Sequence, residues 1–209
     1  MIEQQIRTWD VLDNAVLSLY DDIRRADFVA AAALKDLAYA DVELPIGHGQ
    51  FMLEPKLEAR MLQTLALHKH EEVLHIGTGS GFFAALLGRL TAKVVSMEII
   101  PELSAAATTR LQSHGVNNVT IRTADGACGT LSGELYDAIV LTASTPVISP
   151  NFLRQLKNGG RLLAVEGTAP VMTLTLLEKR TSDIVLRKSI LETCLPPLQN
   201  APLLPTFTF

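Results

Sequence analysis

The sequence has no excess of positive charge. Its 18 Lys and Arg residues stand against 22 Asp and Glu residues, which gives a formal net charge of -4 at pH 7 over 209 residues. Proteins that bind nucleic acid or acidic membranes usually present a basic surface. The composition therefore predicts neither a nucleic-acid partner nor a membrane partner.

The sequence is also poor in cysteine. Cys128 and Cys194 are its only two cysteines, and neither belongs to a CxxC pattern or to a cluster with histidine. This spacing is not typical of a disulfide framework or of a structural metal centre. We expect two buried, reduced thiols and no metal site.

Long apolar runs, repeats and low-complexity tracts are missing as well. No apolar run reaches the roughly 20 residues that a membrane helix needs. The first ten residues, MIEQQIRTWD, lack the basic segment followed by an apolar one that marks a signal peptide. With 48% hydrophobic residues, the chain is expected to fold as one domain over residues 1–209 and to reside in the cytoplasm.

A regular alternation of short apolar strands and helices begins near residue 72. Such alternation predicts right-handed crossovers and a parallel sheet with helices on both faces. The last two strand-like runs surround a polar Lys179–Asp183 turn and indicate an antiparallel C-terminal hairpin. The fold class is therefore α/β and Rossmann-like, with a mostly parallel seven-stranded sheet. The expected strands are 73–76, 93–97, 118–122, 137–143, 161–165 and two within 171–192, and the expected helices are 81–90 and 101 to a left-handed cap at Gly115.

The N-terminal third has a different pattern. Apolar residues at helical spacing predict a helix over 13–29, capped by Asp13. The segment LPIGHGQ (44–50) is expected to be a loop, because its proline and two glycines do not suit a helix or strand interior. Pro55 suits the first turn of a helix. The apolar face of that helix would consist of Leu57, Met61, Leu62 and Leu65.

The segment VLHIGTGSGFFAALLGRL (73–90) predicts a nucleotide site, because its glycines stand between a strand and a helix. The pattern from Gly77 is G-x-G-x-G. The G-x-G-x-x-G pattern of nicotinamide-binding proteins would need glycine where Phe82 stands. Glu98 ends the second strand, where a carboxylate can accept hydrogen bonds from both ribose hydroxyls. Asp125 and Gly126 follow the third strand and are placed to meet an adenine amino group.

Read end to end, the sequence resembles the protein-L-isoaspartate O-methyltransferase family of class I S-adenosylmethionine-dependent methyltransferases. The resemblance implies an N-terminal helical lobe (1–70), a cofactor-binding core (71–209), and a loop near 47–56 that faces a protein or peptide substrate. It places Gly77, Thr78, Gly79, Ser80 and Gly81 against the methionine part of the cofactor, Glu98 on the ribose, and Asp125 and Gly126 on the adenine. The carrying segments are DLAYADVELPIGHGQ, VLHIGTGSGFFAALLGRL, VVSMEIIPEL, YDAIVLTASTPVISP, LRQLKNGGRLLAVEG and LPPLQN.

The sequence departs from the family pattern at two places near the expected site. Leu53 stands where the family has an active-site serine, and His75 stands where the first strand usually carries an acidic residue. Because leucine cannot donate a hydrogen bond to a carboxylate, we expect weak or undetectable methylation of isoaspartyl peptides. We also expect cofactor affinity to fall as the pH drops through about 6.5, since protonated His75 would repel the cofactor's ammonium group.

The chemistry itself requires no catalytic base. A carboxylate acceptor is ionised at pH 7 because its pKa is about 4, so orientation in a dry pocket supplies most of the acceleration. No residue is identified as catalytic, and His48, Gln50 and Leu53 are the candidate substrate residues, with loop-stabilising bonds the alternative role for His48 and Gln50. The alternatives are another acceptor such as a small carboxylate, a cofactor-binding protein without turnover, and a nicotinamide oxidoreductase.

Overall fold

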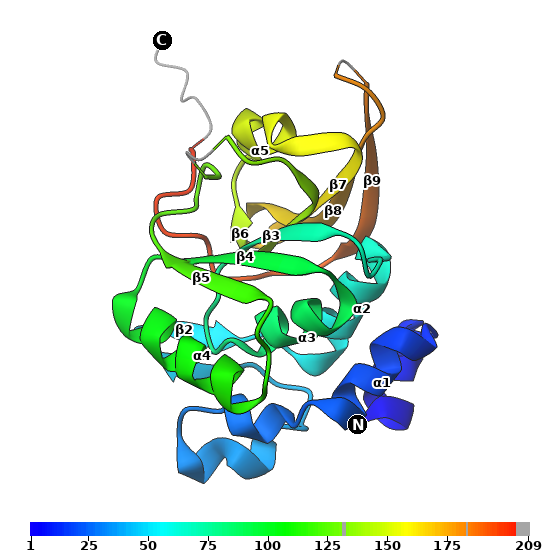
Figure 1. Ribbon diagram of the computed structural model, residues 1–209. Helices are drawn as coiled ribbons and strands as arrows, with labels where there is room; N and C mark the ends of the chain where they lie inside the picture. The colour runs from blue at the N-terminus through cyan, green and yellow to red at the C-terminus, as the bar shows by residue number, and fades with distance from the viewer. Residues whose placement is uncertain (131–132, 183, 204–209) are drawn as a thin grey trace.

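A seven-stranded sheet forms the centre of the computed structural model, which describes residues 1–130, 133–182 and 184–203. The strand order is β5-β4-β3-β6-β7-β8-β9 (Figure 1). Within this sheet, β3 to β7 pair in parallel, and β8 and β9 are added antiparallel. The expected mostly parallel sheet with an antiparallel C-terminal hairpin is confirmed. The strands are β3 (Glu72–Ile76), β4 (Lys93–Glu98), β5 (Val119–Thr123), β6 (Tyr136–Thr145), β7 (Leu156–Thr168), β8 (Val171–Lys179) and β9 (Val185–Glu192).

The turn between β8 and β9 falls where the polar run from Lys179 predicts it, although Asp183 itself lies outside the described residues. The strand order changes direction beside β3, which pairs with β4 on one side and with β6 on the other. In open α/β sheets a crevice forms at this point, outside the carboxyl ends of the strands. The topology therefore predicts where a ligand site should lie.

Helices cover both faces of the sheet, because successive strand residues point to opposite sides. Val73 packs into the larger apolar core with the N-terminal segment and three helices, and Leu74 packs into the smaller core on the opposite face. Among the described residues, one short helix, α5 (Pro150–Arg154), lies on that second face (Figure 1). The helices of the first face are α2 (Pro55–Leu65), α3 (Phe82–Leu90) and α4 (Pro101–Ser113).

The N-terminal lobe is more broken than its periodicity predicts. Asp13 caps α1 (Asn14–Asp22) as expected, with its carboxylate accepting from Ala15 N at 2.8 Å. The expected helix over 13–29 nevertheless ends at Asp22, because the next residue turns to an extended conformation and Ile23 enters the core. The lobe continues in short helical turns: η1 (Ile2–Ile6), η2 (Arg7–Trp9), η3 (Arg25–Phe28) and η4 (Ala32–Leu37).

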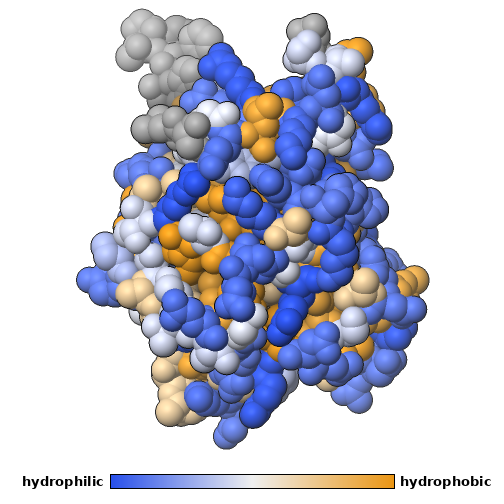
Figure 2. Space-filling view, in the orientation of Figure 1, coloured by the Kyte–Doolittle hydropathy of each residue, from blue (hydrophilic) through white to orange (hydrophobic). Residues whose placement is uncertain are grey.

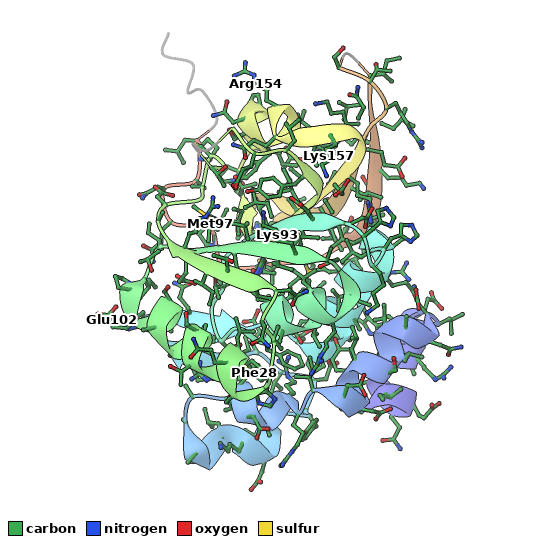
Figure 3. All side chains as sticks on the ribbon, in the orientation of Figure 1. Phe28, Lys93, Met97, Glu102, Arg154 and Lys157 are labelled. Carbon is green, nitrogen blue, oxygen red and sulfur yellow. The ribbon has the colours of Figure 1, made fainter. Side chains whose placement is uncertain are left out.

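Phe28 joins this lobe to the core. Its ring centroid lies 5.3 Å from that of Phe82 on α3 and 4.9 Å from that of His114 at the end of α4. Figure 3 shows the side chain between the lobe and these helices. Aromatic contacts at such distances add to the energy of area burial. The lobe is therefore packed against the face of the core that carries α3 and α4.

The prediction of a loop over 44–50 is wrong. Leu44–Gly47 (β1) and Gln50–Met52 (β2) pair antiparallel in a separate two-stranded hairpin. Its turn residues, His48 and Gly49, have φ values of 54° and 70°. Positive φ at both central positions is what a tight hairpin turn with the right twist requires. The glycines that argued for a loop therefore build the hairpin turn.

The predictions for the start of α2 and for the end of α4 are confirmed. Pro55 occupies the first turn of α2, and Leu57, Met61, Leu62 and Leu65 are buried on its inner face. Gly115 follows α4 with a φ of +63°, the predicted left-handed cap.

Polar residues cover most of one face of the molecule (Figure 2), although the chain is rich in apolar residues. Most of the face shown in Figure 2 is hydrophilic, with apolar residues gathered near its centre. None of the helices in the described ranges combines the length and the apolar character that a membrane crossing needs. Cys128 and Cys194 are free thiols as expected, but the expectation that they are buried is wrong, because both are exposed.

Candidate functional site

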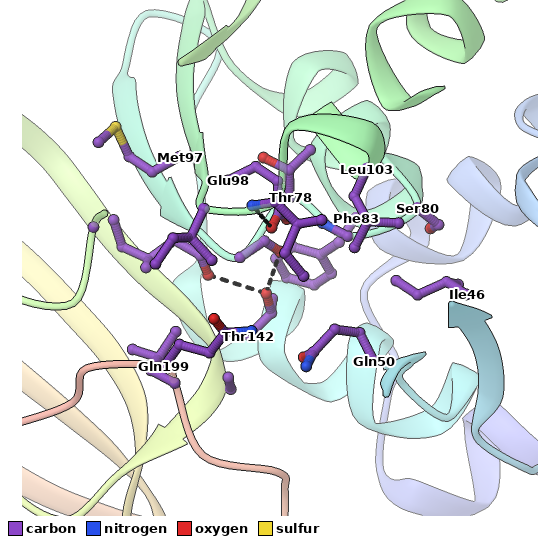
Figure 4. A pocket seen from close by; sticks show the side chains of 18 of the residues that line it. Ile46, Gln50, Thr78, Ser80, Phe83, Met97, Glu98, Leu103, Thr142 and Gln199 are labelled. Atoms are coloured by element: carbon purple, nitrogen blue, oxygen red, sulfur yellow. Dashed lines mark hydrogen bonds between the residues drawn. The ribbon is translucent and has the colours of Figure 1, made fainter. Parts of the chain in front are cut away.

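A cleft lies at the carboxyl ends of β3, β4 and β6, where the strand order changes (Figure 4). It spans about 810 Å³ of space outside protein atoms, part of it open to solvent. Neither Gly81 nor His48 is among its lining residues. The other predicted site residues line it together: Gly77, Thr78, Gly79, Ser80, Glu98, Asp125 and Gly126 from the core, and Gln50 and Leu53 from the hairpin side.

The glycine turn has the backbone geometry that its sequence predicts. Gly77, Gly79 and Gly81 have φ values of 92°, 53° and 89°, a region that disfavours side chains with a Cβ. A Cβ on Gly77 would lie 2.9 Å from Thr142 Oγ1, and a Cβ on Gly81 would lie 3.0 Å from Ala107 Cβ on α4. Gly77 thus allows the turn to approach β6, whereas Gly81 allows α3 to pack against α4. The structure gives Gly81 a packing role and no position on the cleft wall.

A chain of hydrogen bonds lies beneath the turn. Thr142 Oγ1 donates to Gly77 O at 2.8 Å, so its remaining contact with His75 Nε2, at 3.1 Å, requires the ring to donate. His75 Nδ1 then accepts from Ser96 Oγ at 2.9 Å, and Ser96 Oγ accepts from Thr78 Oγ1 at 2.6 Å. Every polar atom of the neutral imidazole is satisfied. The chain fixes one tautomer of His75 and ties the turn to both neighbouring strands.

This environment corrects the expectation that His75 makes cofactor affinity pH-dependent near 6.5. Complete burial lowers the pKa of His75 from 6.5 to about 3. Its two partners are neutral hydroxyl groups, so nothing offsets the cost of charging the ring. His75 is therefore neutral above about pH 4, and it neither attracts nor repels a cation in the cleft.

Glu98 is held rigidly at the cleft wall. Its residue is 5% exposed, its Oε2 accepts from Gly79 N at 2.8 Å, and its Oε1 accepts from Ile100 N at 3.0 Å. A carboxylate offers about four acceptor sites, so each oxygen keeps one for a ligand. Two fixed oxygens with free lone pairs suit a vicinal diol such as that of a ribose.

Asp125 and Gly126 form the next part of the wall. Asp125 Oδ1 accepts from Ala127 N at 2.9 Å, and Oδ2 accepts from the Asn200 side chain at 2.9 Å. A Cβ on Gly126 would lie 3.0 Å from Ile76 Cδ1 and from Met97 Cβ, so a larger residue would fit only if these neighbours moved by a few tenths of an ångström. The arrangement leaves a carboxylate and an adjacent backbone N–H at the cleft edge, as recognition of an adenine requires.

The hairpin side of the cleft is largely apolar. Leu53 is 7% exposed, and Phe51 is 44% exposed at the rim. The Gln50 amide donates to His48 O at 3.5 Å, and His48 itself lies exposed at the hairpin tip, away from the lining. Of the two polar residues predicted to meet a substrate, the cleft includes Gln50 only.

A buried ion pair supports this side. Arg25 on η3 pairs with Glu58 on α2, and it also donates to Leu53 O. The two residues are 1% and 2% exposed. Burial raises the pKa of Glu58 to about 7, although the Arg25 guanidinium acts in the opposite direction. The pair therefore fixes the end of the hairpin to the lobe.

Three polar lining residues were not identified from the sequence: Glu58, Thr142 and Gln199. Thr142 lies near the carboxyl end of a predicted strand. Because ligands bind at the carboxyl ends of the strands in open α/β sheets, its position could have been predicted from the sequence. Glu58 interrupts the buried face of α2. An acidic residue on an otherwise apolar helix face indicates a functional or paired carboxylate, so the sequence could have identified it. Gln199 is brought in by a long-range contact, because Leu198 N donates to Ser144 O at 2.8 Å on β6. Local sequence carries no sign of that contact.

The site fits an adenosine-containing ligand better than a metal. No group of His, Cys, Asp or Glu side chains in the described ranges is arranged to hold a metal ion. The Glu98 carboxylate and the closely packed Gly126 provide the two contacts that a ribose and an adenine need.

Comparison with known sequences identifies relatives along the whole chain. A family model described as Protein-L-isoaspartate(D-aspartate) O-methyltransferase (PCMT) matches residues 1–201. The protein-L-isoaspartate O-methyltransferase of Methanoculleus marisnigri is 42% identical over 184 residues, covering 88% of this chain and 83% of the relative. Protein-L-isoaspartate O-methyltransferase 1 of Nitrosospira multiformis is 41% identical over 188 residues, covering 89% and 79%.

Solved structures share the fold. The crystal structure of a Plasmodium falciparum protein described as a beta-aspartate methyltransferase (PCMT), in complex with S-adenosyl-L-homocysteine, superposes with a TM-score of 0.81. The superposition covers 93% of this chain and 94% of the other, at 17% sequence identity. The N-terminal lobe and the C-terminal hairpin are thus part of the shared architecture.

Proposed function

Because the chain belongs to the protein-L-isoaspartate(D-aspartate) O-methyltransferase family, we propose that it transfers a methyl group from S-adenosylmethionine to the carboxylate of isoaspartyl residues in proteins or peptides. The observation that carries the proposal is the cleft, in which the glycine turn, Glu98 and the Asp125–Gly126 pair face one space. The relatives named for this activity match most of the chain.

The core wall would hold the cofactor. In this proposal Gly77, Thr78, Gly79 and Ser80 contact its methionine part, and Gly81 shapes the turn from behind. Glu98 would accept hydrogen bonds from both ribose hydroxyls, and Asp125 and Gly126 would meet the adenine. When bound, S-adenosylmethionine supplies a methyl group on a sulfonium, whose departure leaves a neutral thioether.

The hairpin wall would orient the acceptor. A substrate carboxylate is already ionised at neutral pH, so the protein needs to position it and exclude water rather than remove a proton. Gln50 is the polar residue of the hairpin that reaches the cleft, and Leu53 shields the site without donating a hydrogen bond. His48 would act from the hairpin tip, on parts of a peptide outside the cleft.

The test is methyl transfer from labelled S-adenosylmethionine to two peptides that differ only in an isoaspartyl or a normal aspartyl residue. The proposal predicts incorporation into the isoaspartyl peptide alone. Incorporation into neither peptide, or into both equally, contradicts it. A free dicarboxylate in a third reaction tests a small carboxylate as acceptor.

Three further features belong to the same proposal. The chain would divide into an N-terminal helical lobe with the substrate loop (1–70) and a cofactor-binding core (71–209). A cytoplasmic location and the lack of a nucleic-acid partner rest on the sequence composition alone, and cell fractionation and a filter-binding assay with duplex DNA check them.

A further inference from the structure

Glu58 is an acidic residue on the inner, apolar face of α2. Its residue is 2% exposed, and its neighbours along the same face, such as Leu57 and Met61, belong to the core. Even so, Glu58 lines the cleft together with the glycine turn. Burying a carboxylate is unfavourable unless partners compensate for its lost hydration, so its position calls for a partner.

Arg25 satisfies only half of this carboxylate. The guanidinium donates to Oε2 of Glu58, and its other terminal nitrogen donates to Leu53 O. Among the described residues none donates to Glu58 Oε1, and this oxygen is not one of the fully buried atoms that lack a partner, so it is open to the cleft. One oxygen of a buried carboxylate in the cleft wall therefore remains free to bind a ligand.

The charges that line the cleft are of one sign. Within the described ranges its acidic residues are Glu58, Glu98 and Asp125, and neither Lys, Arg nor His lines it. Such a lining suits a ligand that carries positive charge. Glu98 is placed for a ribose and Asp125 for an adenine, so only Glu58 is left for a cationic group.

The position of Glu58 matches the methionine end of the cleft. The Arg25 guanidinium carbon lies 5.1 Å from the ring centroid of Phe82, the first residue of α3 after the glycine turn. On the hairpin, Ile46 Cδ1 lies 3.1 Å from where a Cβ on Gly79 would be. The ion pair and the hairpin thus approach the glycine turn from the side opposite the sheet.

We propose that Glu58 is a cofactor-binding residue, whose carboxylate is the counter-ion of the positively charged amino group of the cofactor's methionine part. This inference rests on the proposed function. It also explains how the cleft serves a cationic cofactor although the first strand carries neutral His75 in place of an acidic residue. The attractive charge comes from α2, on the opposite side of the turn from β3.

The proposal has a pH dependence of known sign. Burial raises the pKa of Glu58 to about 7, and the charged and titratable groups that face it are Arg25 on η3 and Tyr20 on α1. Tyr20 stays neutral because burial raises its pKa well above 10.0. Only ionised Glu58 attracts an ammonium group, so affinity for an amino-bearing ligand falls as the pH drops below about 7.

The experiment measures, by calorimetry, the dissociation constants of S-adenosylhomocysteine and of the same thioether without its α-amino group. Glu58→Gln keeps an oxygen that accepts from Arg25 but removes the charge. It should weaken binding of S-adenosylhomocysteine by about tenfold or more and leave binding of the deaminated analogue within about twofold. Glu98→Ala should weaken both ligands alike, and Glu54→Gln, whose partner is Lys56 outside the cleft, should change neither.

Wild-type protein provides a second readout that does not depend on the folding of a variant. The preference for S-adenosylhomocysteine over the deaminated analogue should shrink as the pH falls from 8 to 6. A preference that is constant over this range, or equal weakening of both ligands by Glu58→Gln, overturns the assignment of Glu58. Absence of S-adenosylhomocysteine binding to the wild type would instead overturn the proposed function itself.

Discussion

The two walls of the cleft recognise ligands by different means. On the core wall, backbone geometry sets the site: Glu98 is fixed by the N–H groups of Gly79 and Ile100, and the glycines are required by close packing. On the hairpin wall, side chains set the site, and Phe51 and Leu53 make it apolar. The hairpin wall can therefore change its chemistry without disturbing the sheet. We infer that the core wall, together with Glu58 on α2, binds the cofactor, and that Phe51 and Leu53 of the hairpin wall select the acceptor, largely independently.

The largest effect is a loss of stability, expected when the buried ion pair between Arg25 and Glu58 beside the hairpin wall is broken. Arg25→Gln leaves Glu58 buried without its partner and removes the donor to Leu53 O. Breaking a buried pair from one side costs about 3–5 kcal/mol, and urea unfolding should show a loss of this size. The matched control is Arg7→Gln, whose exposed pair with Glu3 should contribute less than about 1 kcal/mol. Equal losses in the two variants would mean that the buried pair does not support the hairpin wall.

The second effect concerns the acceptor. Phe51→Thr combined with Leu53→Ser supplies a hydroxyl donor and removes apolar bulk from the hairpin wall. An unpaired buried carboxylate costs several kcal/mol, so kcat/KM for an isoaspartyl peptide should rise on the order of a hundredfold. Initial rates at saturating cofactor measure it. A wild type already as active as the double variant shows that Leu53 does not limit acceptor binding, and Val171→Thr, at an exposed site on β8, should leave the rate unchanged.

The third effect is a pH dependence of the folding stability, which His75 is expected to cause without affecting cofactor binding. Its pKa is lowered to about 3 in the folded protein but is near 6.5 when unfolded, so the unfolded state binds the proton first. Stability from neutral His75 is present above pH 6.5 and is lost as the pH falls, by about 1.4 kcal/mol per unit. Glu58, whose pKa is raised, titrates in the opposite sense between about pH 4.5 and 7.

The difference between the wild type and His75→Asn isolates the histidine, because Glu58 titrates in both proteins. Between pH 6.5 and 5 the wild type should lose about 2 kcal/mol relative to the variant in thermal unfolding. Affinity for the deaminated cofactor analogue should stay flat over the same range. A fall in that affinity near pH 6.5 would restore the direct role of His75 that the structure excludes.

The smallest effect is expected at Glu98. Charge-assisted hydrogen bonds contribute roughly 1.5–3 kcal/mol each at best, so Glu98→Ala should weaken S-adenosylhomocysteine binding by about tenfold. Calorimetry checks it, with Glu102→Ala on the exposed face of α4 as the control. Unchanged affinity in a folded Glu98→Ala protein would mean that the carboxylate only ties together the Gly79 and Ile100 backbones.

The core was predictable from sequence because each of its signals is local. The alternation of strands and helices, the spacing of Gly77 to Gly81 and the acidic end of β4 each concern a few neighbouring residues. The hairpin wall was harder to predict from the sequence, since glycine and proline in LPIGHGQ suit either a loop or a hairpin turn. Only tertiary packing brings Glu58 and Gln199 to the cleft, and only the hydroxyl partners of His75 explain its neutrality.

The independence of the two walls is tested most directly by S-adenosylhomocysteine binding to the wild type and to the Phe51→Thr/Leu53→Ser variant, measured by calorimetry at one pH. The account predicts dissociation constants that agree within about twofold, because the altered residues belong to the wall that selects the acceptor. A change of tenfold or more, equivalent to about 1.4 kcal/mol, would show that the hairpin takes part in cofactor binding and would contradict the division of labour between the walls.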